Sequence, residues 1–266
     1  MSKEISKAGK EKFRPEDLRR LQEFRLMDDD FMVKCFEEDI DCIQMLLDNL
    51  LDLYDLKIKK VAVQKLQCRS IILDIHAMDY VGKRYNVKVQ TADHDSWEKR
   101  QEYYLSLMAA NETDPEENPE NLVETYLLLI TEHDVFGLGE PIYHVDEIIR
   151  EGDGNIGDNI HILYANGDYR AESPKGLLLH DFSCTDAKDM RYKVLADRVK
   201  YFKEDERGVA VMCKAMEDMR NEAAIEEGRK IAFNMLSLGK LSYEEIAGCT
   251  ELSVEEVKEL AAKKEA

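Results

Sequence analysis

The sequence contains no long hydrophobic run, and no segment approaches the roughly 20 consecutive apolar residues that a membrane-spanning helix requires. The N-terminal segment MSKEISKAGKEKFRPED also lacks the apolar stretch of a secretory signal. None of the six cysteines belongs to a CxxC pair. We expect these scattered thiols to stay reduced in a cytoplasmic protein and not to form a zinc site.

Positive charge is scarce as well. The formal net charge is -19 at pH 7, which argues against a large non-specific DNA-binding surface. The exception is the basic stretch Lys57–Arg69, KIKKVAVQKLQCR, which carries lysines and an arginine but no acid. Any contact with DNA is therefore expected on this local patch, although a solvated edge strand protected by lysines has the same composition.

The length and composition are those of a globular protein with a full core. With 266 residues, 44% hydrophobic and 35% charged, the chain can form one large domain or a domain with an appendage. A helix is predicted from Asp30 to Leu53, because apolar residues recur there at spacings of three and four. Residues 28–30 are placed to cap its N-terminus.

The middle of the chain has the pattern of strands with one further helix. The helix is expected at about Ser96–Ala110. Buried or half-buried strands are expected in TYLLLITEHDVF, PIYHVDEII and NIHILYAN. The segment DAKDMRYKVLADRVKYF begins a helical C-terminal part. There, two capping boxes, Ser242 with Glu245 and Ser253 with Glu256, predict two short helices.

The segments SIILDIHAMDY and RYNVKVQTAD flank a turn that contains Gly82, and together they predict a β-hairpin. If the turn is centred on Val81, His76 pairs with Asn86 and Asp74 pairs with Lys88. Strand side chains alternate between faces. One face is therefore apolar, and the other carries a polar row: Asp74, His76, Asn86, Lys88 and Gln90.

An ordered set of segments resembles the PD-(D/E)XK nuclease family transposases, relatives of the recombination-promoting nucleases of bacteria. The set comprises DDDFMVKCF, SIILDIHAMDYVGKRYNVKVQ, KRQEYYLSLM, ETYLLLITEHDVFG, HILYANGDYR, LLLHDFSCTDAKDMRYKVLADRVKYFKEDERG and the C-terminal LSYEEIAGCTELSVEEVKELA. The resemblance implies an α/β fold: a restriction-endonuclease-like core with a mixed central sheet flanked by helices. The match begins at about Asp28, so a nuclease-like domain is expected over 28–205 and a helical C-terminal extension over 206–266. Residues 1–27, which mix charges with little periodicity, are expected to be a flexible N-terminal lead-in that ends in a short helix or an extended arm.

The resemblance also implies a Mg²⁺-dependent site for cleaving DNA. In the family an Asp on the first hairpin strand and a Glu on the second bind the metal, and a Gln two residues later replaces the superfamily's usual Lys. By position these are Asp74 and Gln90, with Asp30 as a supporting acid at the start of the first helix. Two close carboxylates suit a hard dication, which then activates water.

The position of the metal-binding Glu, however, holds Lys88, and an ammonium cannot bind Mg²⁺. Three interpretations remain open. The site is inactive and Asp74 forms an ion pair with Lys88; or the carboxylate has moved to a neighbouring element, with Glu98 and Glu102, or Asp93 and Asp95, as candidates; or Asp30 or Glu37 completes a weak site with Asp74.

The sequence thus predicts a metal-dependent DNA endonuclease of the recombination-promoting type that is impaired by Lys88. The alternative is a catalytically silent nuclease-fold protein that binds DNA or partner subunits, or a homo-oligomer built on the helical tail. The glutamates at the start of the last helix favour packing over DNA reading there. The pairs His133–Asp134 and His180–Asp181 are interpreted as structural.

Overall fold

The computed structural model describes residues 12–53, 55–65, 73–91, 123–146 and 159–265. For residues 64, 65, 73, 74 and 263–265 it describes the backbone alone. The helix expected at Ser96–Ala110 lies outside these residues, as do Asp93, Asp95, Glu98 and Glu102. None of the helices described is both long and apolar enough to cross a membrane.

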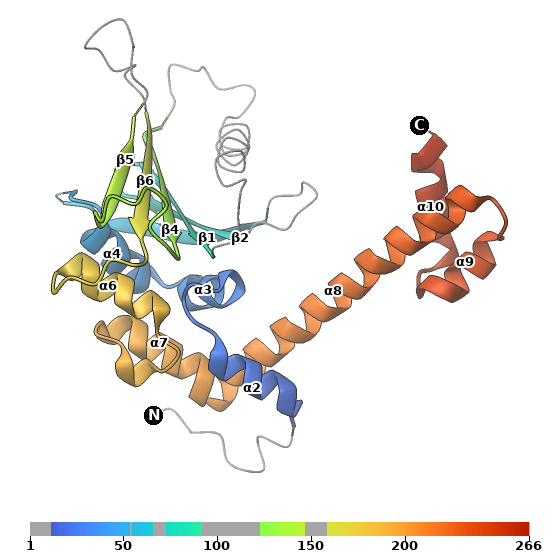
Figure 1. The fold of residues 1–266 in the computed structure, drawn as a ribbon, viewed down its shortest axis with the longest axis horizontal. Coiled ribbons are helices and arrows are strands. Elements are labelled where there is room, and N and C mark those ends of the chain that lie inside the picture. The colour runs from blue at the N-terminus through green and yellow to red at the C-terminus, as the bar shows by residue number, and fades with distance from the viewer. Residues whose placement is uncertain (1–11, 54, 66–72, 92–122, 147–158, 266) are drawn as a thin grey trace, which may run out of the picture.

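The described part of the chain is built around a mixed six-stranded sheet, in agreement with the predicted α/β class (Figure 1). The strand order is β1-β2-β3-β4-β6-β5. β1, β2 and β3 are antiparallel, β3, β4 and β6 are parallel, and β5 is antiparallel to β6. The strands are β1 (Ile58–Lys65), β2 (Leu73–Asp79), β3 (Arg84–Gln90), β4 (Thr125–Thr131), β5 (Ile142–Val145) and β6 (Ile160–Asn166).

One face of the sheet forms the main hydrophobic core with the helices. Ile75, Val87 and Ile130 belong to this core and are fully buried. The helices that cover this face lie together on one side of the sheet (Figure 1): α3 (Asp29–Phe36), α4 (Ile40–Leu50), α6 (Pro174–Ser183) and α7 (Lys193–Glu204). Opposite them, Leu127, Leu129, Tyr143 and Tyr164 form a second, smaller apolar cluster.

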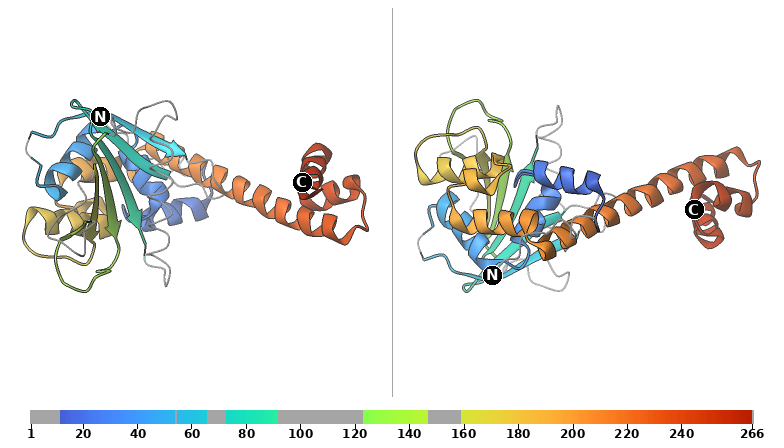
Figure 2. Two further views of the ribbon diagram at one scale, coloured as in Figure 1. Left: turned by 90° about the horizontal axis from the view of Figure 1, so that it is seen from above. Right: turned by 90° about the horizontal axis from the view of Figure 1, so that it is seen from below.

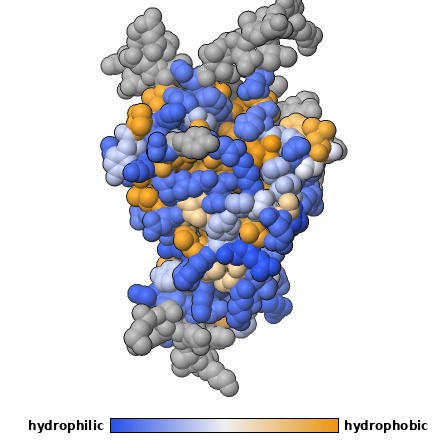
Figure 3. Space-filling model, turned by 90° about the vertical axis from the view of Figure 1, so that its left-hand side faces the viewer, coloured by the Kyte–Doolittle hydropathy of each residue, from blue (hydrophilic) through white to orange (hydrophobic). Residues whose placement is uncertain are grey.

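On the side turned away from the C-terminal helices, the described residues of the globular part form no broad apolar region. Figure 3 shows that face as mostly hydrophilic, with hydrophobic side chains in separate small patches. Isolated apolar side chains of this kind are normal on a protein surface.

The single helix predicted from Asp30 to Leu53 is wrong, because the chain forms two helices there. α3 ends at Phe36, and Glu38 adopts a left-handed backbone with φ of 60°. Asp39 then caps α4 by accepting a hydrogen bond from the Cys42 amide at 3.0 Å. Both helices bury apolar side chains in the same core, so the three-and-four spacing continues across the break.

The capping predicted for α3 also differs in detail. Asp28 is the N-cap residue but makes no side-chain hydrogen bond to the helix. Its carboxylate instead accepts the backbone N–H of Arg25 at 2.7 Å. Asp29 and Asp30 lie in the first turn, where negative charge is favourable.

The N-terminal lead-in contains the short helix that was one of its two expected forms. This helix is α2 (Pro15–Glu23), and its Leu21 is fully buried in the main core. The buried Lys203 of α7 ties the end of α2 in place, because its Nζ donates to the carbonyls of Gln22, Phe24 and Thr185. The C-terminal helical part also begins earlier than expected, with α6 at Pro174.

The hairpin between β2 and β3 has the predicted register. Ile75 pairs with Val87, and His76 pairs with Asn86. The carboxylate of Asp79 fixes the turn: its Oδ1 accepts the amides of Val81, Gly82 and Lys83 at 2.8–2.9 Å. Gly82 has φ of +100°, a conformation that glycine adopts without strain.

A long helix carries the C-terminal end of the chain away from the sheet. α8 (Glu206–Leu238) is 33 residues long, and Figures 1 and 2 show it leaving the globular part as a rod. Its first turns enter the main core through Val209, Met212 and Met216. Every side chain over residues 221–227 is exposed. We call this exposed part of α8 the bare segment.

The far end of α8 packs with two short helices, α9 (Tyr243–Thr250) and α10 (Val254–Glu265). Both predicted caps are confirmed: Ser242 and Glu245 form a capping box, and Ser253 bonds with Glu256 in the same way. A third apolar cluster holds this distal unit together, and it contains Ile246, Leu252 and Val257 with Ala232. At Gly228 an added Cβ would lie 2.5 Å from the Thr250 carbonyl oxygen, so the close packing there requires glycine.

We predict that Asp79→Ala lowers the free energy of unfolding by about 2–4 kcal/mol, because three turn amides and the Tyr85 hydroxyl lose their acceptor. Asp79→Asn is the matched control, since its side-chain carbonyl can still accept the amides, and it should cost less. Denaturant unfolding measures both. Equal losses for the two variants would contradict the assigned role of the carboxylate.

We predict that ending the chain at Gly239 leaves a core with a cooperative thermal transition, because the distal unit has its own apolar cluster. Differential scanning calorimetry of the shortened and full-length chains tests this. Loss of the cooperative transition would show that the distal unit stabilises the core. Light scattering on the same samples reports any change in oligomeric state.

Candidate functional site on strands β2 and β3

The candidate site lies on the face of the sheet opposite the main core. Lys88 pairs in parallel with Leu129 of β4, and Asn86 pairs with Leu127. Partners in a parallel ladder point to the same side of a sheet. Because Leu127 and Leu129 belong to the smaller apolar cluster, Asn86 and Lys88 lie beside that cluster.

The polar side chains of this face are well shielded from water. Asn86 is 1% exposed and Lys88 is 7% exposed, while His76 and Gln90 are half-buried. A buried ammonium is costly unless charged or polar groups surround it. Lys88 is therefore integrated into the sheet and is not a mobile surface lysine.

Asp74 is described through its backbone, which pairs with Gln64 of β1. The hairpin register runs through Ile75 and Val87. Extending it by one residue sets Asp74 opposite Lys88. The predicted contact between the two side chains lies outside the described part and stays a prediction.

The two helix acids that were proposed as supporting ligands have other described neighbours. Burial raises the pKa of Asp30; Asp28 and Glu222 raise it further, while Arg20 and Lys34 oppose the shift. Glu37 forms an ion pair with Lys34 at 2.8 Å. Asp30 lies in the first turn of α3, and Glu37 is its C-cap residue. The apolar side chains of α3 belong to the main core, together with Ile75 and Val87.

Glu132 is an acid near the site that the sequence analysis did not select. Its amide donates to the Gln90 carbonyl at 3.0 Å, so it continues the ladder between β3 and β4. Its carboxylate, however, binds Arg25 at 2.7 Å. Arg25 lies between α2 and α3, on the side of the main core. The ion pair therefore directs Glu132 away from Lys88.

The described side chains of this face do not make a magnesium site. On β2 and β3, the described polar groups of this face are the imidazole of His76, the amides of Asn86 and Gln90, and the ammonium of Lys88. Mg²⁺ requires oxygen ligands, usually with one or two carboxylates, and an ammonium repels the ion. A magnesium site here would need Asp74 together with a second carboxylate from another element.

The basic stretch is a sheet edge in its described part. β1 is an edge strand, and Lys57, Lys59 and Lys60 at its start are exposed. This agrees with the interpretation of a lysine-protected edge, and it also leaves these ammonium groups accessible to phosphate. Lys65 and Arg69 are not described at the side-chain level.

Both histidine–aspartate pairs have structural roles for their acids. Asp134 organises the loop after β4: it accepts the amides of Gly137 and Gly139 and the hydroxyl of Tyr143. Asp181 accepts the amides of Arg191 and Tyr192, both at 2.8 Å, and so holds the start of α7. The hydrogen bonds of Asp134 organise a local loop, whereas those of Asp181 join residues ten and eleven positions apart.

Comparison with known proteins agrees with this geometry. The sequence model of the family described as PD-(D/E)XK nuclease family transposase matches residues 33–166, just over half of the 266 residues. Searches of curated proteins and of solved structures each found no match. The matched region contains the complete hairpin with Asp74, Lys88 and Gln90, together with all six strands. The chain therefore belongs to the PD-(D/E)XK nuclease family transposases.

Proposed function

We propose that this protein is a DNA endonuclease of the recombination-promoting type whose metal-dependent cleavage is impaired by Lys88. The observation that supports the proposal is the buried position of Lys88 in the hairpin, next to Val87, which pairs with Ile75. Extending this register by one residue would set Lys88 opposite Asp74. Family membership supports DNA as the substrate. Asp74 would be the metal ligand and Gln90 the group that positions water or phosphate.

Charge accounting at one position explains the impairment. Two carboxylates would give the site about two negative charges, enough to hold a dication whose phosphate substrate is also anionic. With Lys88 present, the pair with Asp74 is close to neutral. The ammonium then replaces the metal as the local positive charge.

The same ammonium is compatible with DNA binding. Lys88 is a point charge that attracts a phosphate, and the exposed lysines at the start of β1 add a local basic edge. Binding should therefore outlast cleavage. Because such binding would rest on contacts between lysine ammonium groups and phosphates, we expect it to weaken as salt increases.

A catalytically silent binding or oligomerisation module is the second candidate function. The observation that favours it is the distal unit, which α8 holds apart from the sheet (Figure 2). Such a unit can join copies of the chain, or join the chain to an active relative, without contributing to chemistry. The oligomeric state of the full-length and shortened chains separates this role from that of an independent enzyme.

We predict that the native protein nicks plasmid DNA poorly or not at all in Mg²⁺ or Mn²⁺, and that Lys88→Glu raises the nicking rate by about tenfold or more. Metal affinity should return first, because the substitution restores the second carboxylate beside Asp74. Calorimetric titration with Mn²⁺ and plasmid nicking measure the two effects on the same preparations.

Two variants make the test specific to the carboxylate. Lys88→Met removes the ammonium without adding a ligand, and it should stay inactive. Adding Asp74→Ala to Lys88→Glu should abolish both metal binding and nicking. If the native protein cleaves DNA robustly and Asp74→Ala abolishes that cleavage, the proposal of an impaired site is overturned. Glu98 and Glu102 would then be the first residues to mutate. A Lys88→Glu protein that folds but neither binds metal nor nicks DNA would overturn the charge argument.

A further inference from the structure

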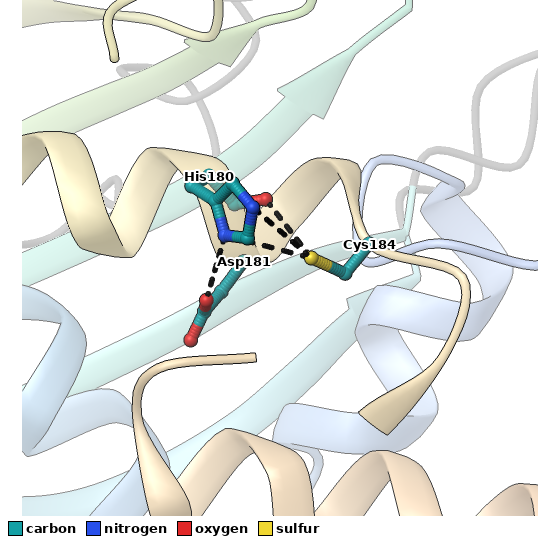
Figure 4. Close-up of side chains that lie close together, drawn as sticks. All are labelled: His180, Asp181 and Cys184. Carbon is teal, nitrogen blue, oxygen red and sulfur yellow. Dashed lines mark hydrogen bonds and ion pairs between the residues drawn. The ribbon is translucent and has the colours of Figure 1, made fainter. Parts of the chain in front are cut away.

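Three potential metal-binding side chains meet at the C-terminal end of α6. His180 and Asp181 lie in its last turn, and Cys184 is its C-cap residue. Residues four apart on a helix lie on the same face, which brings the His180 ring to the Cys184 thiol. Figure 4 shows the imidazole between the carboxylate and the sulfur. One ligand atom from each of the three residues lies within 4.8 Å of the others.

Two of the three distances between these atoms match the edges of a tetrahedral zinc site. His180 Nδ1 is 3.3 Å from Asp181 Oδ1, and Cys184 Sγ is 3.6 Å from His180 Nδ1. With Zn–N and Zn–O bonds of about 2.0–2.1 Å and a Zn–S bond of about 2.3 Å, tetrahedral angles require N···O of about 3.4 Å and N···S of about 3.6 Å. A metal ion could bind with little movement of these two pairs.

The carboxylate is already held in position by groups that would support a ligand. Asp181 is 0% exposed, and its two oxygens accept the amides of Arg191 and Tyr192, each at 2.8 Å. A carboxylate has about four acceptor positions, so each oxygen keeps one for a metal. Hydrogen bonds of this kind orient ligating carboxylates and strengthen metal binding.

The other two ligands leave a path for an ion. The His180 side chain is 33% exposed, and Cys184 is half-buried. Three protein ligands complete all but one position of a tetrahedron, and water can occupy the fourth. An imidazole, a thiolate and a carboxylate together favour zinc over Mg²⁺, since Mg²⁺ prefers oxygen ligands alone.

We propose that His180, Asp181 and Cys184 bind a single zinc ion that joins the end of α6 to the start of α7. This site is separate from the β2–β3 face and does not depend on the proposed nuclease activity. It revises the expectation that the cysteines form no zinc site. The link between the two helices depends on Asp181, because its carboxylate holds the backbone at Arg191 and Tyr192 and would also bind the ion.

The test is titration of the full-length, metal-stripped protein with Co²⁺, which reports its ligands by absorption. We expect one equivalent of Co²⁺ to give the visible bands of a tetrahedral ion and a thiolate-to-cobalt charge-transfer band in the near ultraviolet. Zn²⁺ should displace the Co²⁺, whereas Mg²⁺ should not. Zn²⁺ should also raise the thermal unfolding temperature.

Cys184→Ser should remove the charge-transfer band and weaken Zn²⁺ binding by about tenfold or more. His180→Gln should also weaken Zn²⁺ binding, and it provides a second variant should the serine protein fail to fold. Cys249→Ser is the matched control, because Cys249 is an exposed thiol on α9 and its loss should change nothing. The absence of a thiolate band in the native protein, or its survival in Cys184→Ser, would overturn the proposal.

Discussion

The placement of the whole candidate site depends on one carboxylate at the tip of a hairpin. Asp79 binds three successive turn amides and, through its other oxygen, the hydroxyl of Tyr85 at 3.1 Å. These bonds set which residues of β2 and β3 face each other. A slip of one residue would exchange the two faces of a strand, so Val87 would leave the core and Lys88 would enter it. Asp79 therefore determines which side of the sheet carries the polar row.

The register of the hairpin also affects the rest of the sheet, through β3. β3 is the strand that changes from antiparallel pairing with β2 to parallel pairing with β4. β4 is buried along its entire length, so its register decides how the two apolar clusters divide between the faces. Lys88 thus has an apolar neighbour in β4 and, by register, an acidic position in β2. The charge around Lys88 therefore depends on the residues of these two strands and on any other side chain that approaches this face of the sheet.

The sequence was most informative where the interaction is local. The alternation in β2 and β3 predicted the pair of His76 with Asn86 correctly, and the capping boxes at Ser242 and Ser253 predicted the correct helix starts, because the partners lie within a few residues. The break at Glu38 was missed, since both helices keep their apolar side chains toward one core. The contacts of Lys203 and Glu132 could not be predicted either, because they join elements far apart in the chain. For the candidate site, the sequence supplied the positions of Lys88 and Gln90 on the polar face, but not the parallel pairing of Lys88 with Leu129 of β4.

The length of the bare segment of α8 affects how the distal unit is oriented. Each residue of an α-helix advances it by about 1.5 Å and rotates it by about 100°. Because the side chains of residues 221–227 are all exposed, a residue could be added or removed there without disturbing either apolar cluster. The distal unit would move only slightly along the helix axis, but it would be rotated by about 100° around that axis. The number of residues in this segment therefore determines the direction in which the surface of the distal unit faces, relative to the globular part.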